Sequence, residues 1–175
     1  MNAPERAGGR APDLIVPIVG FRQWRIVDGE PLSVYDGAPW PNGGITARCH
    51  RGHVDVPAKE CTCGVYAYYD PCPRTASTAT ADLIGGAAVL WGRIEAHMYG
   101  LRGEHARIVA FELPLSRGRK RRAVVEAAKR VGVPVIPHRS LKGVALEHGA
   151  VLQPALRPKK TLTRAANVWT RNGPA

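Results

Sequence analysis

Residues 49–72 read CHRGHVDVPAKECTCGVYAYYDPC, and this stretch contains all four cysteines of the chain and two of its six histidines. Zinc binds thiolate and imidazole ligands, and structural zinc sites hold the ion in a tetrahedron of four such ligands. We therefore predict that this stretch holds one zinc ion. The predicted ligands are Cys49, His53, Cys61 and Cys63, with His50 and Cys72 as the alternatives.

The spacing of the ligands predicts a closed site. Cys61-Thr62-Cys63-Gly64 reads as a tight turn with two thiols, and Gly64 can adopt the positive φ that such a turn needs. Cys-x-Cys is shorter than the Cys-x-x-Cys of most zinc motifs. Because six candidate ligands lie close together, we expect a structural site and not a catalytic one with an open position.

Two other interpretations of the cysteines stay open, which are disulfides and free buried thiols. Disulfides need an oxidising compartment. The sequence before Leu14 is rich in Pro, Gly and Arg and has no apolar signal segment. We therefore expect a reduced, cytoplasmic protein. No apolar run approaches the roughly 18 residues that a membrane span requires.

The positive charge lies almost entirely in the last third of the chain. Residues 1–112 hold 11 Lys/Arg and 12 Asp/Glu, whereas residues 113–175 hold 14 Lys/Arg and 2 Asp/Glu. Such asymmetry is typical of proteins that bind a polyanion, most often a nucleic acid. The alternative is a basic surface that serves only solubility.

Short apolar segments between glycine and proline turns predict strands over residues 14–19, 21–27, 32–35, 65–69, 87–94 and 106–113. The Asp28-Gly29 pair predicts a hairpin turn, and Gly85-Gly86 and Gly100 also read as turns. Leu14 to Val19 contains Pro17 and fits an edge strand. Several short strands of this kind predict a small, partly open β-barrel.

The pattern becomes helical after residue 116. Ser116 is a candidate cap for a helix over 117–131, whose apolar stripe is Val124, Ala127, Ala128 and Val131. Gly132 fits the end of that helix. A strand over 133–136 and a helix over 140–147 follow, with Leu141, Val144, Ala145 and His148 facing inward. The fold class is therefore α+β. The predicted domains are a disordered arm at 1–12, one zinc-stabilised domain at 13–153 and a basic tail at 154–175.

Three stretches resemble a family of small uncharacterised proteins from actinobacteria and their phages. They are FRQWR at 21–25, CTCGVYA at 61–67, and LWGRI at 90–94 with GLR at 100–102 and EHA at 104–106. The Cys…His…Cys-x-Cys order is similar too, and the resemblance spans about residues 20–137. It implies a shared fold and a phage or mobile-element origin, without a known activity. The strand order also resembles PUA-like barrels, a superfamily that includes readers of modified bases.

Nucleic-acid binding is the function that the charge pattern favours. Lys and Arg side chains would neutralise phosphates, and an exposed aromatic ring would stack on a base. Trp40, between two prolines, is expected to be exposed, whereas Trp91, in an apolar strand, is expected to pack in the core. The candidate contacts are Arg119, Lys120, Arg122, Lys129, Arg130, Lys159, Lys160 and Trp40.

Two other functions are kept as alternatives. The first is a protein–protein interaction, in host takeover or regulation, through the barrel or the helix at 117–131. The second is a metal-dependent, nuclease-type enzyme, in which Glu95, His97, Glu104 and His105 form a cluster at the Gly100 hairpin. Strand alternation puts Glu95 and His97 on one face. The four residues lack a recognised catalytic spacing, so we expect a solvated hairpin and no enzyme activity.

Overall fold

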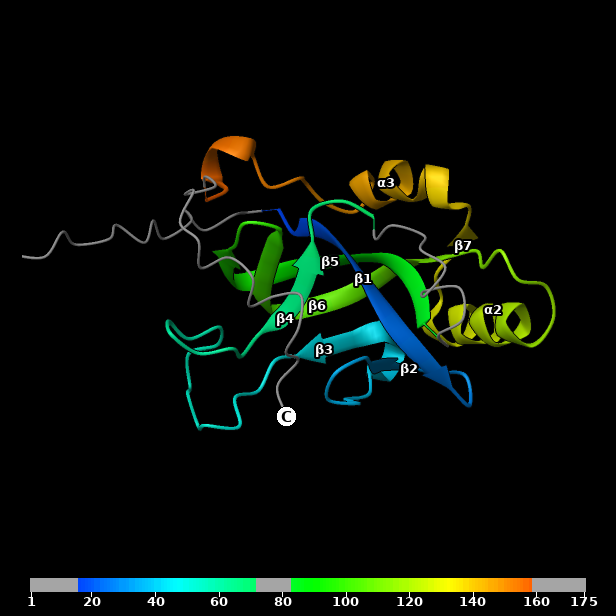
Figure 1. Cartoon of the computed structure of the whole chain (residues 1–175), viewed down its shortest axis with the longest axis horizontal. Helices are drawn as coiled ribbons and strands as arrows, with labels where there is room; N and C mark the ends of the chain where they lie inside the picture. Colours follow the sequence, from blue (N-terminus) through cyan, green and yellow to red (C-terminus); the bar gives the residue numbers. More distant parts are fainter. Residues whose placement is uncertain (1–15, 72–82, 159–175) are drawn as a thin grey trace, which may run out of the picture.

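The structure is a computed structural model, and it describes residues 16–71 and 83–158 of the chain (Figure 1). It is a mixed α+β fold that consists mostly of sheet, with two α-helices in these ranges. The strands are β1 (Ile18–Val27), β2 (Glu30–Ser33), β3 (Gly44–Thr46), β4 (Val65–Tyr68), β5 (Leu83–Ala96), β6 (Gly100–Glu112) and β7 (Val135–Ile136). The helices are α2 (Arg119–Val131) and α3 (His138–Leu146), with short 3-10 turns η1 (Pro41–Gly43) and η2 (Pro154–Leu156).

The long antiparallel pair of β5 and β6 forms the centre of the sheet. β1 pairs with β5 along Ile18–Arg25, and β4 and β3 both pair with β6. The path β1–β5–β6–β4 returns to β1 through a single residue pair, Phe21 and Tyr68. The strands therefore curve around one core, but they do not form a clear barrel.

The Gly85-Gly86 pair, which was predicted to form a turn, instead allows neighbouring strands to approach closely. Gly85 and Gly86 lie inside β5, opposite Gln23 and Arg22 of β1, so the predicted turn is wrong. A Cβ atom on Gly86 would lie 2.5 Å from the carbonyl oxygen of Ala110. The glycines are needed because another chain segment packs directly against them.

Two other boundaries near strands differ from the sequence prediction. β1 begins at Ile18 and pairs with both β2 and β5, so Ile18 and Val19 belong to a paired strand and not to an edge strand, whereas residues 14 and 15 lie outside the described ranges. Gly100 begins β6 and pairs with Tyr68, so the turn of the hairpin lies before it. The hairpin between β1 and β2 is confirmed: Asp28 and Gly29 have φ of 49° and 76°. Positive φ at both central residues is what a tight two-residue hairpin turn requires.

The helices keep their predicted apolar faces but begin at other residues. Val124, Ala127, Ala128 and Val131 of α2 are buried, as predicted. The residue that caps α2 is Gly118, without a side-chain hydrogen bond, so the predicted Ser116 cap is wrong. Gly132 ends α2 at φ 76°. In α3 Leu141 and Ala145 are buried and Val144 is half-buried, whereas His148 lies beyond the end of the helix and is exposed.

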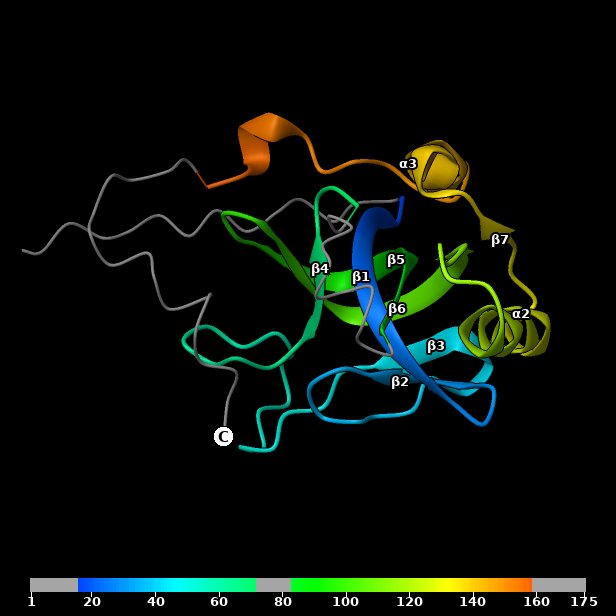
Figure 2. The ribbon, with the colours of Figure 1, turned by 45° about the vertical axis from the view of Figure 1, so that its right-hand side comes forward.

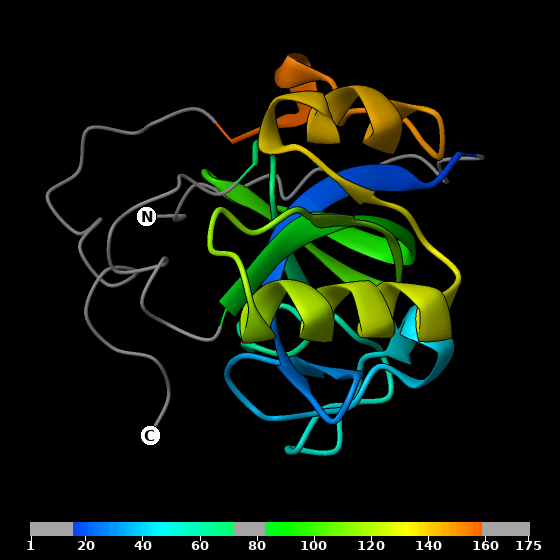
Figure 3. The same ribbon diagram turned by 90° about the vertical axis from the view of Figure 1, so that its right-hand side faces the viewer.

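The two helices pack on opposite faces of the curved sheet (Figure 3). The larger core lies between the sheet and α2, and contains Trp24, Trp40, Leu90 and Phe111. The smaller core lies under α3 and contains Phe21 and residues of β5 and β6. Among the described residues, neither helix has the length and apolar composition of a membrane span. The predicted arm at 1–12 and the tail from residue 159 lie outside the described ranges.

Candidate metal centre

The chain between β3 and β4, residues 47–64, is called the metal loop here. Figure 2 shows it at the end of the sheet away from α2 and α3. It brings together the side chains of Cys49, His53, Cys61 and Cys63, whose ligand atoms all lie within 4.8 Å of one another. The Cys49 sulfur lies 3.1 Å from His53 Nδ1 and 3.7 Å from the Cys61 sulfur. Two thiolates on one tetrahedral zinc ion lie about 3.8 Å apart, so the group has the dimensions of a metal site.

Of the two alternative ligands, only His50 lies among the residues that the structure describes. His50 is exposed and is not part of this group, and Cys72 lies outside the described residues. The three described cysteines are free thiols, so they form no disulfide with one another. The four residues predicted from the sequence are therefore the ones that the fold places together.

The thiols differ in acidity because their surroundings differ. Burial acts to raise the pKa of the Cys49 thiol. Hydrogen bonds from the His53 and Arg51 backbone, and from the Cys61 and His53 side chains, outweigh burial and lower that pKa to about 6. Burial also raises the pKa of Cys63, and the nearby sulfurs raise it further, against a hydrogen bond from the Ala58 N–H at 3.2 Å. Neighbouring thiolates repel one another, and a bound cation offsets that repulsion.

Arg102, on β6, is buried beneath the metal loop with 3% of its surface exposed. Its guanidinium donates to the backbone carbonyls of Cys61 and Cys63, the latter at 2.9 Å. It also pairs with the Glu95 carboxylate. The loop that carries two of the four ligands is thus held on the sheet by one buried cation, which the sequence analysis did not single out.

The same guanidinium fixes the protonation of His97. Arg102 Nε donates to His97 Nε2 at 2.9 Å, which requires the lone pair of a neutral ring. Burial lowers the pKa of His97, Arg102 lowers it further, and Glu95 acts against them. Glu95 and His97 lie on one face, as strand alternation predicts, and His97 Nε2 is 3.6 Å from a Glu95 carboxylate oxygen. Arg102 engages both, so the pair belongs to the support of the metal loop.

Glu104 and His105 form a second pair elsewhere on the hairpin. His105 Nδ1 lies 3.0 Å from the Thr46 hydroxyl and its Nε2 lies 3.5 Å from Glu104. In the ranges that the structure covers, the metal-loop group is the single set of three or more His, Cys, Asp or Glu with metal-binding geometry. The alternative of a metal cluster formed by Glu95, His97, Glu104 and His105 is therefore not supported.

The exposure predictions for Trp40 and Trp91 are both wrong. Trp40 is fully buried and packs edge-on against Trp24, with ring centroids 5.4 Å apart. Its indole N–H donates to the Ser33 hydroxyl at 3.0 Å. It is thus excluded as a base-stacking residue. Trp91, expected in the core, is 40% exposed. Flanking prolines carry no information about which distant residues pack around a ring.

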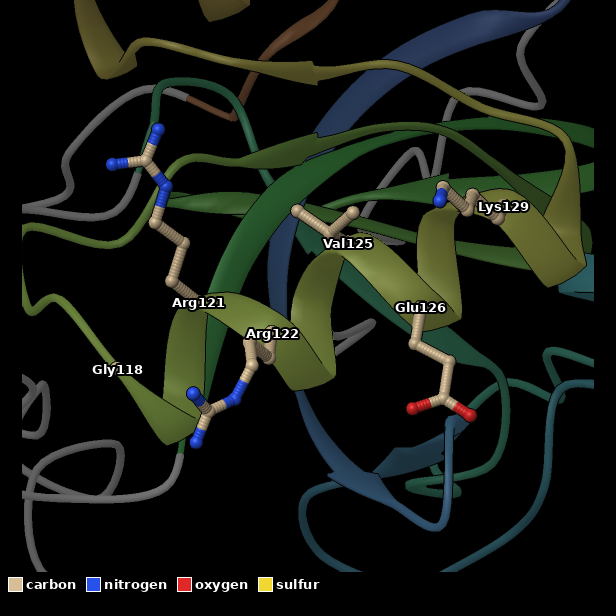
Figure 4. Close-up of a pocket in the computed structure, with 6 residues that line it drawn as sticks. All are labelled: Gly118, Arg121, Arg122, Val125, Glu126 and Lys129. Atoms are coloured by element: carbon tan, nitrogen blue, oxygen red, sulfur yellow. The ribbon is translucent and has the colours of Figure 1, made fainter.

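The basic residues of α2 lie as predicted, on the side of the helix away from the core. Arg119, Arg122, Lys129 and Arg130 are exposed and Lys120 is partly buried, whereas Lys159 and Lys160 lie outside the described residues. The helix borders an open pocket of about 420 Å³ (Figure 4). Its lining residues are Gly118, Arg121, Arg122, Val125, Glu126 and Lys129. Arg121 is a further exposed cation that the prediction omitted.

A comparison of the chain with protein-family models, with curated proteins and with solved structures found no match. The resemblance to actinobacterial and phage proteins therefore stays a prediction from the sequence.

Proposed function

We propose that the protein is a nucleic-acid-binding module that a structural zinc ion stabilises. Three thiolates and one imidazole form a ligand set that favours zinc among the common metals. All four coordination positions are supplied by side chains, which is typical of a structural site. The near closure of β1, β5, β6 and β4 supports the further proposal of a PUA-like, partly open barrel.

The observation that carries the nucleic-acid proposal is the exposed face of α2. The helix begins with Arg119-Lys120-Arg121-Arg122, and Glu126 is its one acidic residue. Cations in the first turn oppose the helix dipole, and α2 has neither an acidic first turn nor a side-chain cap to compensate. This arrangement costs helix stability, and binding to phosphates would offset the cost. The cationic first turn of α2 therefore favours a polyanion as the partner.

The test is a fluorescence-anisotropy titration of labelled duplex DNA and RNA at several salt concentrations. If about five cations meet phosphates, the logarithm of affinity should fall against log salt with a slope near −4 to −5. Changing Arg119, Arg122 and Lys129 to Gln should flatten the slope by roughly one for each lost contact. The fold should survive, because all three side chains are exposed.

The matched control changes Arg25, Arg139 and Lys142 to Gln. These three cations are also exposed but lie on β1 and α3. The control removes the same net charge and should leave the slope within experimental error. Equal effects of the two triple variants would contradict a site on α2. Absence of binding by the wild type at about 50 mM salt would refute nucleic-acid binding and favour a protein partner.

A further inference from the structure

Strand β5 is irregular directly after Trp91. The pairing with β6 shifts between Trp91 and Ile94, so two residues of β5 oppose one residue of β6. Gly92 has φ 76°, and a Cβ atom there would lie 2.8 Å from the Glu104 carboxylate and 2.9 Å from the His105 ring. Bulges of this kind redirect side chains and are common beside functional sites.

The bulge holds an exposed aromatic ring in a fixed orientation. Trp91 is 40% exposed, and its ring stacks on His105 with centroids 5.6 Å apart and planes 24° from parallel. His105 is itself positioned from both sides, by the Thr46 hydroxyl on β3 and by Glu104. The ordering of the indole is therefore achieved before any ligand binds, which reduces the entropy cost of stacking on it.

Exposed arginines lie on the segments that neighbour this ring in the sheet and in the chain. Arg107 lies two residues after His105 on β6, so both project from the same face of the strand. Arg48 and Arg51 are exposed on the metal loop, which follows β3 directly. The acidic groups nearby are already engaged: Asp55 pairs with Arg93 at 2.8 Å, and Glu104 accepts the Arg93 backbone N–H at 3.2 Å. An aromatic surface with this charge complements a chain of bases and phosphates.

We propose that Trp91 and His105 form a stacking platform for an unpaired base of a single-stranded nucleic acid. The proposal rests on the proposed function and specifies its substrate. Bases in a duplex already stack on one another, so an isolated protein ring is accessible only to a base outside a duplex. Arg48, Arg51 and Arg107 then lie where the flanking phosphates pass. The metal ion acts indirectly, by holding the loop that carries two of these arginines.

The experiment compares a labelled oligo-dT strand of about 15 nucleotides with a duplex of the same length, at about 100 mM salt. Trp91→Ala should bind the single strand about tenfold more weakly, because one stacking contact is lost. Trp91→Phe keeps a smaller ring and should lose only about threefold. Tyr35→Ala removes an aromatic side chain that is 76% exposed on the loop after β2, and it should bind as the wild type does. Duplex binding should be the same for all four proteins.

Unchanged single-strand binding by Trp91→Ala would overturn the platform and leave the α2 proposal standing, because the duplex titrations test that separately. An equal loss on single strand and duplex would overturn it as well, since it would indicate a general contact. Failure of the wild type to bind either ligand would refute both proposals. Thermal melting of each variant verifies that the exposed substitution leaves the fold intact.

Discussion

At the residue scale, Arg102 is a buried side chain that links the metal loop to the sheet. Its partners are Glu95 and His97 of the hairpin of β5 and β6, and the backbone carbonyls of Cys61 and Cys63. A buried polar group that loses its partner costs about 1–3 kcal/mol. Arg102 satisfies two loop carbonyls at once, so its replacement has a large expected effect.

Arg102→Met should lower the free energy of unfolding by about 3 kcal/mol, because the carbonyls of Cys61 and Cys63 lose their donor. Metal affinity should fall by about 10- to 100-fold, as expected when a group that orients ligands is removed. Urea denaturation and a zinc-competition titration measure the two effects. Arg107→Met, on the same strand but exposed, should change stability by less than about 0.5 kcal/mol. Unchanged metal affinity in Arg102→Met would show that the loop holds its ligands without help.

Individual residues also mark the limit of sequence reasoning. Cys49, His53, Cys61 and Cys63 were predictable because ligand chemistry identifies thiols and imidazoles directly, and they lie close together in the chain. Arg102 has no such signal, since its role depends on carbonyls about 40 positions away. Strand β6 contains both Arg102 and Arg107, and nothing in the sequence pattern distinguishes the buried arginine from the exposed one.

At the element scale, β5 combines two departures from regular sheet. Near its start, Gly85 admits the Glu112 side chain, and Gly86 admits the Trp24 ring and the backbone of β6. Further along the strand, a bulge follows the exposed Trp91. Both features depend on residues without a side chain. The strand is therefore sensitive to an added Cβ atom at both places.

Gly86→Ala should lower the free energy of unfolding by about 1–3 kcal/mol. The new Cβ atom would meet the Ala110 carbonyl at 2.5 Å and the Trp24 ring at 2.9 Å, and the first of these belongs to the backbone of a paired strand. Gly143→Ala is the matched control. Gly143 lies inside α3 with nothing within 4 Å of a new Cβ, so alanine should stabilise the protein by about 0.5–1 kcal/mol. Chemical denaturation measures the free energy of unfolding of both variants. An unchanged value for Gly86→Ala would mean that β5 can shift away from β6.

At the scale of the whole molecule, the metal loop touches the larger hydrophobic core only through Ala47 among the residues assigned to the clusters. Neither of the two core clusters contains a metal ligand, and the loop lies at the end of the sheet away from both helices. The basic face of α2 and the Trp91 platform likewise use different elements. Proteins open in cooperative units of unequal stability, and this loop has the features of one such unit.

Removal of the metal with a strong chelator should therefore unfold the loop before the sheet. Hydrogen exchange should lose protection across residues 47–64, whereas the amides of β5 and β6 stay protected. The melting temperature should fall, because metal binding contributes to folding free energy. Cys61→Ser should give the same exchange pattern without chelator, which controls for chelator effects. Simultaneous loss of protection in the loop and the sheet would mean that metal site and core unfold together.

Features that depend on near neighbours in the chain were predictable without the fold. They are the ligand set of the metal loop, the Asp28-Gly29 hairpin turn, the apolar stripe of α2 and the location of positive charge. The fold was needed to show the burial of Trp40, the exposure of Trp91, the strand position of Gly85-Gly86 and the role of Arg102. Periodicity, turn chemistry and ligand type act over a few residues, and so a single sequence records them. Burial and hydrogen-bond satisfaction depend on segments brought together from distant parts of the chain.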